Sequence, residues 1–341
     1  MNIDIKHSLL SKESSNFIKG VLIAFVVFGH NMFITSLHPK IQLLVSLFNV
    51  SNFFILVFAY GSGDDLPFAK YLKKISFRML PYYIATFIVY AVLYKIYMVS
   101  SETETLSIGI KDYILAIILG GPRLKETTGF LLLWFFPAFY YFLVLKYFVL
   151  NRKFYFVVVL SLAVFLYFYA KDGYYCYQRS NAIISSLYFL SYAMVTNLIL
   201  RKFKLERIFW ISLFLYTAIF FRHTIYACKF TVFLVPGLVF IILFRISKIN
   251  FLLECYIGKF FIFLGKNSLY IYVSHMLFFY MLYFLYFRDS NISIYEKAIY
   301  TYISEIALAI LFSIGFKWIN KTICNITTAF INKTNYNNTV K

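Results

Sequence analysis

The chain has 341 residues, of which 62% are hydrophobic and only 14% are charged, and it carries a net charge of +19. In a soluble protein this charge would suggest nucleic-acid binding, but here apolar runs recur along nearly the whole chain and the cations gather between them. We therefore expect a membrane protein with no nucleic-acid partner.

Segments long enough and apolar enough to cross a bilayer, which takes about 20 residues, follow one another along the chain. A further apolar run, 110–120, is too short to span and predicts a re-entrant or interfacial helix. The expected fold class is all-α: a polytopic membrane helix bundle of about ten transmembrane helices, in one domain over residues 1–341. The predicted spans are 17–36, 41–60, 79–99, 129–149, 153–170, 182–200, 207–221, 229–246, 262–287 and 297–319.

Lys and Arg are distributed unevenly between these spans. They are frequent before the first span, after each even-numbered span and in the C-terminal tail, and sparser in the other connections. Because cytoplasmic loops collect Lys and Arg, both termini are predicted to be cytoplasmic.

The four cysteines have no metal-ligand spacing, so no metal site is expected. Cys176 and Cys228 fall on the outer side of the predicted topology, where they would form a disulfide if that side is oxidising. The alternative is that both are isolated buried thiols.

Two ionisable side chains, Lys19 and His30, lie in the first predicted span. Eleven residues of α-helix place them within about 20° of the same face and about 16 Å apart along the axis. A neutral imidazole can take a proton from a hydroxyl group near neutral pH, so His30 is a candidate catalytic base, and Lys19 at the cytoplasmic edge suits a phosphate group. The alternatives are an interhelical hydrogen bond for His30 and a positive-inside anchor for Lys19.

Lys74 and Arg78 lie one helical turn apart in the connection after the second span and would form a two-pronged cationic site. The functional interpretation is a grip on a phosphorylated cofactor at the cytoplasmic face. The alternative is ordinary positive-inside charge that contacts lipid headgroups. Pro81 suits the first turn of the third span.

Trp134 lies in the fourth span, before Phe135, Phe136 and Pro137. An aromatic residue at a membrane interface usually belongs to the aromatic belt. Because Trp134 follows the polar outer loop, it is also a candidate to stack on a sugar ring.

A polar stripe runs along the ninth span, where Ser268, Tyr272 and His275 are spaced i, i+4 and i+7 and share one helical face. Asn267 and Ser268 belong to a Gly-Lys-Asn-Ser opening that suits a helix N-terminus. These four polar residues are candidate substrate contacts. The alternative is that they hold neighbouring helices together.

Glu305 is the one carboxylate predicted well inside a span, the tenth. Counted from the outer helix ends, Glu305 lies about 12 Å deep and His30 about 9 Å deep. The similar depth makes Glu305 a candidate catalytic residue that orients His30 or stabilises its charge. The alternatives are a pair with a lysine or a silent protonated acid.

Taken together, five stretches resemble the acyltransferase-3 family of integral membrane acyltransferases, of the polysaccharide O-acetyltransferase type. They are the first helix, with Lys19 and then Gly29-His30; Phe53-Phe54 through Ala59-Tyr60-Gly61; Arg78-Met79-Leu80-Pro81-Tyr82; Leu133-Trp134-Phe135-Phe136-Pro137; and Gly265 through Tyr272 followed by His275. The family often has arginine at the position of Lys19. A lysine there keeps the positive charge but cannot make the bidentate contact of an arginine.

The resemblance implies an O-acyltransferase that uses acetyl-CoA as co-substrate, has no permanently bound cofactor, and acetylates a cell-surface glycan such as a lipopolysaccharide O-antigen. It implies that His30 is the essential histidine, Lys19 the basic residue of its motif, and Arg78 the basic residue of the second-to-third helix junction. The expected partners are membrane lipid and a glycan or lipid-linked glycan acceptor. The abundance of Phe, Tyr, Ile, Lys and Asn is typical of an AT-rich bacterial gene. Together with the predicted spans and the resemblance, this gives the bacterial inner membrane as the expected location.

Two other classes of function stay open. A transporter or flippase of lipid-linked sugars would also need many spans and intramembrane polar groups, but it predicts inverted repeats and broken helices, which the sequence does not display. A glycan polymerase or ligase would need a long outer loop with several arginines, and the connection 100–128 offers only Arg123.

Overall fold

The computed structural model describes residues 10–37, 66–100, 108–120, 122–129, 132–152, 182–222, 229–287 and 290–339. Every element in these ranges is helical, which confirms the all-α expectation for this part of the chain. By length and composition, two described segments could cross a membrane, Phe68–Ile96 and Ile294–Gly315. The predicted spans 41–60 and 153–170, together with Cys176 and Cys228, lie outside the described residues.

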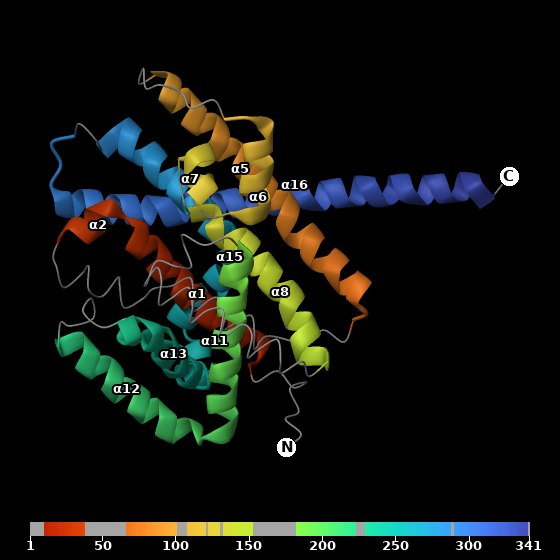
Figure 1. Ribbon diagram of the computed structural model, residues 1–341. Coiled ribbons are helices and arrows are strands. Elements are labelled where there is room, and N and C mark those ends of the chain that lie inside the picture. The colour runs from red at the N-terminus through yellow and green to blue at the C-terminus, as the bar shows by residue number, and fades with distance from the viewer. Residues whose placement is uncertain are drawn as a thin grey trace.

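Each predicted span within the described ranges overlaps a helix, although several helix ends differ from the prediction. Figure 1 shows how the helices are arranged. In chain order they are α1 (Lys12–His30), α2 (Met32–Leu37), α5 (Phe68–Ser100), α6 (Ile110–Leu119), α7 (Pro122–Thr128), η1 (Leu132–Trp134), α8 (Phe135–Arg152), α11 (Ala182–Lys202), α12 (Leu205–Arg222), α13 (Lys229–Ile246), α14 (Asn250–Glu254), α15 (Tyr256–Leu282), η4 (Tyr283–Phe287) and α16 (Ile294–Thr339). The short helix expected over 110–120 is α6, which at about 15 Å is too short to span.

The first predicted span is not one continuous helix. α1 ends at His30, and α2 starts at Met32. Asn31 separates them because its Oδ1 accepts hydrogen bonds from the backbone N–H groups of Phe33 and Ile34, which caps α2. Its Nδ2 also donates to the Thr301 hydroxyl at 2.8 Å, so the break is fixed against α16.

Two other helices begin earlier than hydropathy predicts. α5 starts at Phe68, so Lys74 and Arg78 lie on a helix rather than in a loop, and Pro81 lies inside α5 rather than in its first turn. α15 starts at Tyr256, where the Cys255 Sγ accepts from the backbone N–H of Gly258, so the Gly-Lys-Asn-Ser stretch is helix interior and not a helix N-terminus. In both places the helix begins before the apolar run and includes the charged residues that precede it.

α1 and α15 form the most closely packed helix pair among the described elements. A Cβ on Gly20 would strike the carbonyl oxygen of Phe261, and one on Gly265 would strike the carbonyl oxygen of Asn16. Two glycines thus let the backbones touch, as small residues do at membrane helix interfaces. α16 packs against both helices, and Tyr302 Oη donates to the Ala24 carbonyl at 3.1 Å.

α5 and α8 complete the group of helices around this pair. The hydroxyls of Tyr82 and Tyr90 on α5 donate to backbone carbonyls of α15 at 3.1 and 3.2 Å. Tyr71 on α5 donates to the Leu143 carbonyl of α8 at 3.1 Å. Tyrosine is well suited to this position because its ring fills the apolar interior while its hydroxyl finds a partner.

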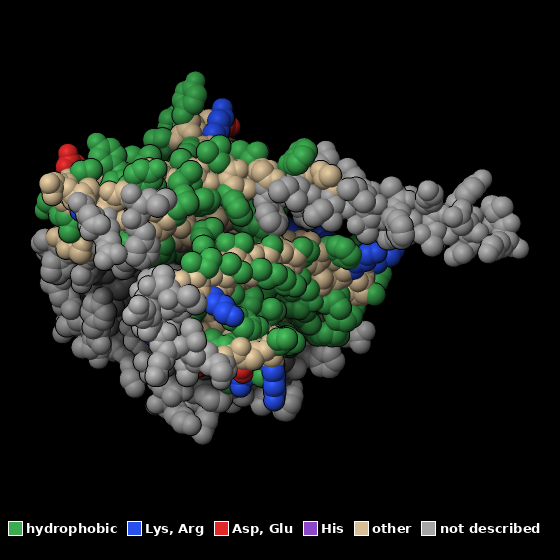
Figure 2. Space-filling model, turned by 90° about the horizontal axis from the view of Figure 1, so that it is seen from above, with side chains coloured by type: hydrophobic (Ala, Val, Ile, Leu, Met, Phe, Trp, Pro, Cys, Tyr) green, Lys and Arg blue, Asp and Glu red, His purple; other side chains and the backbone are tan. Residues whose placement is uncertain are grey.

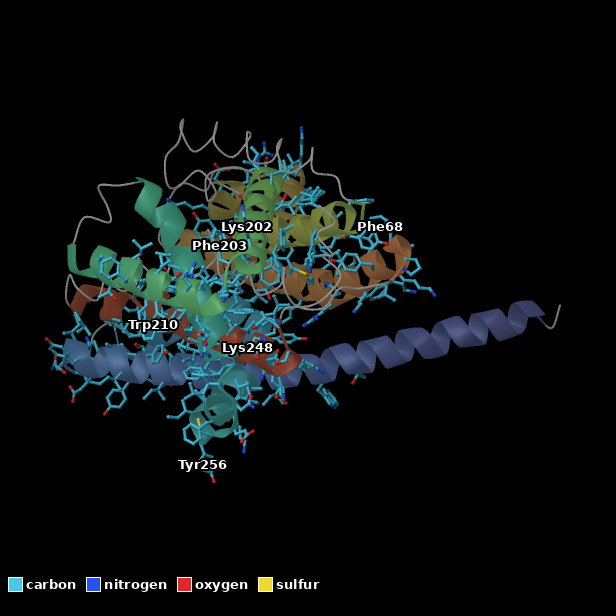
Figure 3. All side chains as sticks on the ribbon, turned by 90° about the horizontal axis from the view of Figure 1, so that it is seen from below. Phe68, Lys202, Phe203, Trp210, Lys248 and Tyr256 are labelled. Carbon is cyan, nitrogen blue, oxygen red and sulfur yellow. The ribbon has the colours of Figure 1, made fainter. Side chains whose placement is uncertain are left out.

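The outer surface of the described helices is strongly apolar. Hydrophobic side chains cover most of the coloured face in Figure 2, and Tyr256 points outward at the periphery in Figure 3. Phe214 on α12 is 72% exposed and Leu311 on α16 is 64% exposed. Soluble proteins seldom expose apolar surface on this scale.

Candidate functional site

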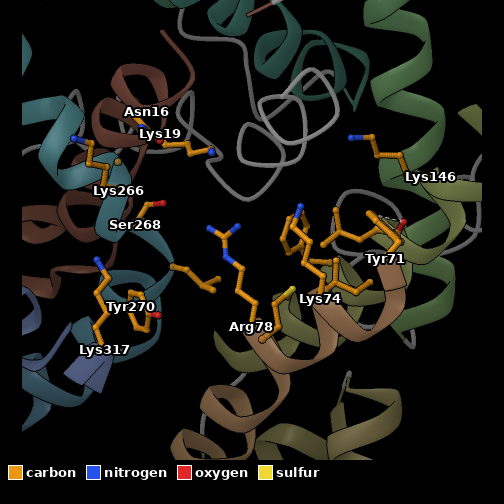
Figure 4. A pocket seen from close by; sticks show the side chains of 16 residues that line it. Asn16, Lys19, Tyr71, Lys74, Arg78, Lys146, Lys266, Ser268, Tyr270 and Lys317 are labelled. Carbon is orange, nitrogen blue, oxygen red and sulfur yellow. Dashed lines mark hydrogen bonds between the residues drawn. The ribbon is translucent and has the colours of Figure 1, made fainter. Parts of the chain in front are cut away.

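A cavity of about 250 Å³ lies where α1, α5, α8, α15 and α16 meet (Figure 4). Six cationic side chains from these five helices line it, and no Asp or Glu is among the described lining residues. Ser268, Tyr71 and Tyr270 supply polar atoms or ring faces. The six cations are Lys19, Lys74, Arg78, Lys146, Lys266 and Lys317.

The cavity brings together the three cations that the sequence singled out, Lys19, Lys74 and Arg78. Sequence reasoning did not assign Lys146, Lys266 and Lys317 to the same site. The available signal was topology, since each of these residues lies near the end of a predicted span that positive-inside charge assigns to the cytoplasmic side. The structure brings these residues together, although Lys266 and Lys317 lie in the interior of α15 and α16.

Asn267 holds one wall of the cavity in place. Its Oδ1 accepts from the Lys317 Nζ and, at 3.3 Å, from the Ser313 hydroxyl. The Lys317 ammonium also lies 5.2 Å from the centre of the Tyr270 ring. Asn267 was expected to contact the substrate, but it is buried and does not line the cavity. Its hydrogen bonds instead connect α15 to α16.

A pair of histidines lies about 16 Å further along α1. His30, the last residue of α1, and His275 on α15 have ring centres 5.2 Å apart. The Nε2 of His275 is 3.4 Å from the Nδ1 of His30. His275 is fully buried, whereas His30 is partly exposed.

Glu305 does not make the predicted contact with His30. Its side chain is fully buried on α16, and neither carboxylate oxygen has a hydrogen-bond partner among the described residues. Thr301, which bonds Asn31, is level with the end of α1, so Glu305 lies one turn, about 6 Å, further along α16. The group that the structure places against His30 is the imidazole of His275.

Trp134 and Tyr272 belong to the core. Trp134 is 6% exposed and packs edge-on against Phe135, with Phe189 as a second aromatic neighbour. Tyr272 is 6% exposed, and its ring lies 5.0 Å from Phe135. Neither ring offers a face to a sugar in this arrangement, so the predicted stacking role of Trp134 has no geometric support.

The predicted polar stripe on α15 does occupy one face, but its three members lie in different surroundings. Ser268 lines the cationic cavity, Tyr272 packs in the core, and His275 contacts His30. α1 connects the same two places through Lys19 and His30. Cationic side chains at one end and imidazoles toward the other are thus held by the same two helices.

The described residues contain no group of His, Cys, Asp or Glu that could hold a metal ion. A scan against protein-family models finds no match to this chain, and searches of curated proteins and of solved structures find none either.

Proposed function

We propose that this chain is an integral membrane O-acyltransferase that moves an acetyl group from acetyl-CoA to a hydroxyl of a cell-surface polysaccharide such as O-antigen. The observation that carries the proposal is the joint placement on α1 and α15 of a six-cation cavity and of a histidine pair. The first suits a polyanionic donor, and the second suits proton transfer from a hydroxyl group.

The donor would bind through its phosphates. Coenzyme A carries several phosphate charges, and Arg and Lys are the usual partners of phosphate oxygens. The cavity is smaller than the roughly 300–1,000 Å³ of pockets that enclose whole ligands, so it would hold the phosphates while the pantetheine arm extends toward His30. That arm, when extended, is comparable in length to the separation of Lys19 and His30.

In the transfer step His30 would act as the general base. The acceptor hydroxyl oxygen forms a bond to the thioester carbonyl carbon while His30 takes the hydroxyl proton. The carbon–sulfur bond then breaks, the acetyl group remains on the sugar as an ester, and the proton passes to the departing thiolate. This chemistry needs an accessible imidazole, and His30 is the more exposed member of the pair.

The membrane part of the proposal is a bundle of about ten spans in the bacterial inner membrane, with both termini cytoplasmic. The exposed apolar side chains of α5, α12 and α16 support immersion in lipid. The shared location of the six cations supports a cytoplasmic side at the cavity, because positive charge collects there. Acetyl-CoA would then enter from the cytoplasm.

A transporter or flippase of lipid-linked sugars is the second candidate. The same cavity supports it, because the phosphate of a lipid-linked sugar would also suit six cations. The histidine pair favours the enzyme, since transport of a sugar phosphate does not require a proton acceptor beside the path.

The test is to incubate membranes that contain the protein with acetyl-CoA labelled in the acetyl group and with extracted surface glycan. We expect label in the glycan, none with His30→Ala, and normal insertion of that variant. Lys19→Gln should raise the donor KM by about 10–100-fold, the loss of one charge-assisted hydrogen bond. Lys204→Gln, which removes an exposed lysine outside the cavity, should change nothing. Label-free glycan, or full activity in His30→Ala, would refute the proposal, and sugar translocation without label would favour the transporter.

A further inference from the structure

We infer that His275 is a positioning residue for His30, a role that rests on the proposed acyl transfer. The Nε2 of His275 accepts the Nδ1 proton of His30. This leaves the Nε2 lone pair of His30 as the atom that takes the proton of the acceptor hydroxyl.

The protonation of His275 follows from its neighbours. Its Nδ1 lies 2.7 Å from the Tyr272 carbonyl oxygen and 3.2 Å from the Ile271 carbonyl oxygen. Carbonyl oxygens only accept, so Nδ1 must carry the hydrogen. A neutral imidazole has one N–H, and the Nε2 of His275 is therefore an acceptor.

The same argument then fixes His30. Its Nδ1 lies 2.9 Å from the Val26 carbonyl oxygen and 3.4 Å from the Nε2 of His275. Both neighbours are acceptors, so the hydrogen of neutral His30 is on Nδ1, where it is shared between them. No described residue makes a hydrogen bond to the Nε2 of His30, and its lone pair is available to a substrate.

The contribution of His275 goes beyond the choice of tautomer. The Val26 carbonyl belongs to α1 itself, whereas His275 belongs to α15 and sets the direction of the His30 ring from outside its own helix. When His30 gains a proton, its Nδ1–H becomes a stronger donor, and the neutral acceptor beside it stabilises the new charge. This is the part that an orienting carboxylate plays for other catalytic imidazoles.

His275 is poorly placed to contact a substrate directly. Its side chain is fully buried, and both ring nitrogens face protein atoms. The substrate-binding role that the sequence suggested for it is therefore replaced by contact with His30.

The activity test compares His275→Gln with His275→Leu. A Gln side chain can present its amide oxygen close to the position of Nε2, so this variant should stay within a few-fold of the wild-type kcat. Leu offers no acceptor, and kcat should fall by about 10–100-fold, the range seen when the hydrogen-bond partner of a metal-ligating histidine is removed, with the donor KM unchanged. Binding of coenzyme A by both variants checks that they are folded. Wild-type kcat in His275→Leu, or equal losses in both variants, would overturn the inference.

A second measurement does not depend on acyl transfer. In protein labelled with ¹⁵N at histidine and reconstituted in lipid, the nitrogen shifts of His30 and His275 should each indicate a protonated Nδ1 and a bare Nε2. Resonances are assigned by their disappearance in His30→Gln and His275→Gln. A protonated Nε2 on either ring would refute the pairing. The expected tautomers without acetyl transfer to any glycan would leave the pairing intact and reject the proposed function.

Discussion

Gly20 is the position where a single methyl group should separate the two halves of the candidate site. In Gly20→Ala the new Cβ would strike the carbonyl oxygen of Phe261 and lie 3.0 Å from the backbone nitrogen of Gly265. These are backbone atoms, so no side chain can rotate away. α1 must move from α15, and with it Lys19 moves from Lys266 and His30 from His275.

The expected loss of stability follows from two opposing effects. An extra methyl group in a close-packed interface costs about 1–3 kcal/mol, and a contact with backbone belongs at the upper end. Alanine is favoured over glycine within a helix by about 1 kcal/mol. The net destabilisation of Gly20→Ala should therefore be about 2 kcal/mol.

Gly315→Ala is the matched control, because nothing lies within 4 Å of a Cβ at that position on α16. Its free energy of unfolding should rise by about 1 kcal/mol, from the higher helix propensity of alanine alone. Thermal unfolding of both variants in detergent should give a midpoint a few degrees below wild type for Gly20→Ala and equal to or above it for Gly315→Ala. Acetyl transfer should fall only in Gly20→Ala. Equal midpoints for the two variants would show that α1 and α15 do not meet as described.

Substitutions at four further positions test the surroundings of the site. Glu305→Met should raise the free energy of unfolding by about 1–3 kcal/mol, since it removes a buried carboxyl group that has no hydrogen-bond partner among the described residues. Loss of transfer in this stable variant would instead give Glu305 a part in the reaction. Asn31→Leu should cost about 1–3 kcal/mol in a thermal melt, because it removes the cap of α2 and the bond to Thr301, and Thr301→Val should cost less. Trp134→Ala should lower the free energy of unfolding by about 3–5 kcal/mol as a core truncation. Trp134→Phe should leave the acceptor KM unchanged, and a raised acceptor KM would indicate that Trp134 does contact the sugar.

Helix content and the grouping of cations could be predicted from the sequence, because each depends on a local property. The described apolar runs are helical, and Lys19, Lys74 and Arg78 share a cavity, as their location on one side of the predicted topology indicates. Helix ends were less accessible to this reasoning. Lys and Arg are good helix formers. α5 and α15 therefore begin at Phe68 and Tyr256, before the apolar runs that hydropathy detects.

Contacts between helices could not be predicted, because depth along a helix does not fix which neighbour a side chain faces. Glu305 and His30 were matched by depth alone, yet the pairing of Asn31 with Thr301 sets Glu305 one turn away. The partner of His30 is 245 residues distant in the chain. Only the packing of α1 on α15, which Gly20 and Gly265 permit, brings the two imidazoles together.

The length of α16 has a practical consequence. Its 46 residues extend about 69 Å, more than twice the hydrocarbon thickness of a bilayer, about 30 Å. The C-terminal part of α16 projects from the remaining helices (Figure 1), and residue 339 lies about 36 Å beyond Gly315 along the helix axis. A fluorescent protein fused there would sit clear of the membrane surface, so its accessibility to an impermeant quencher from either compartment would read out directly which way the bundle is inserted.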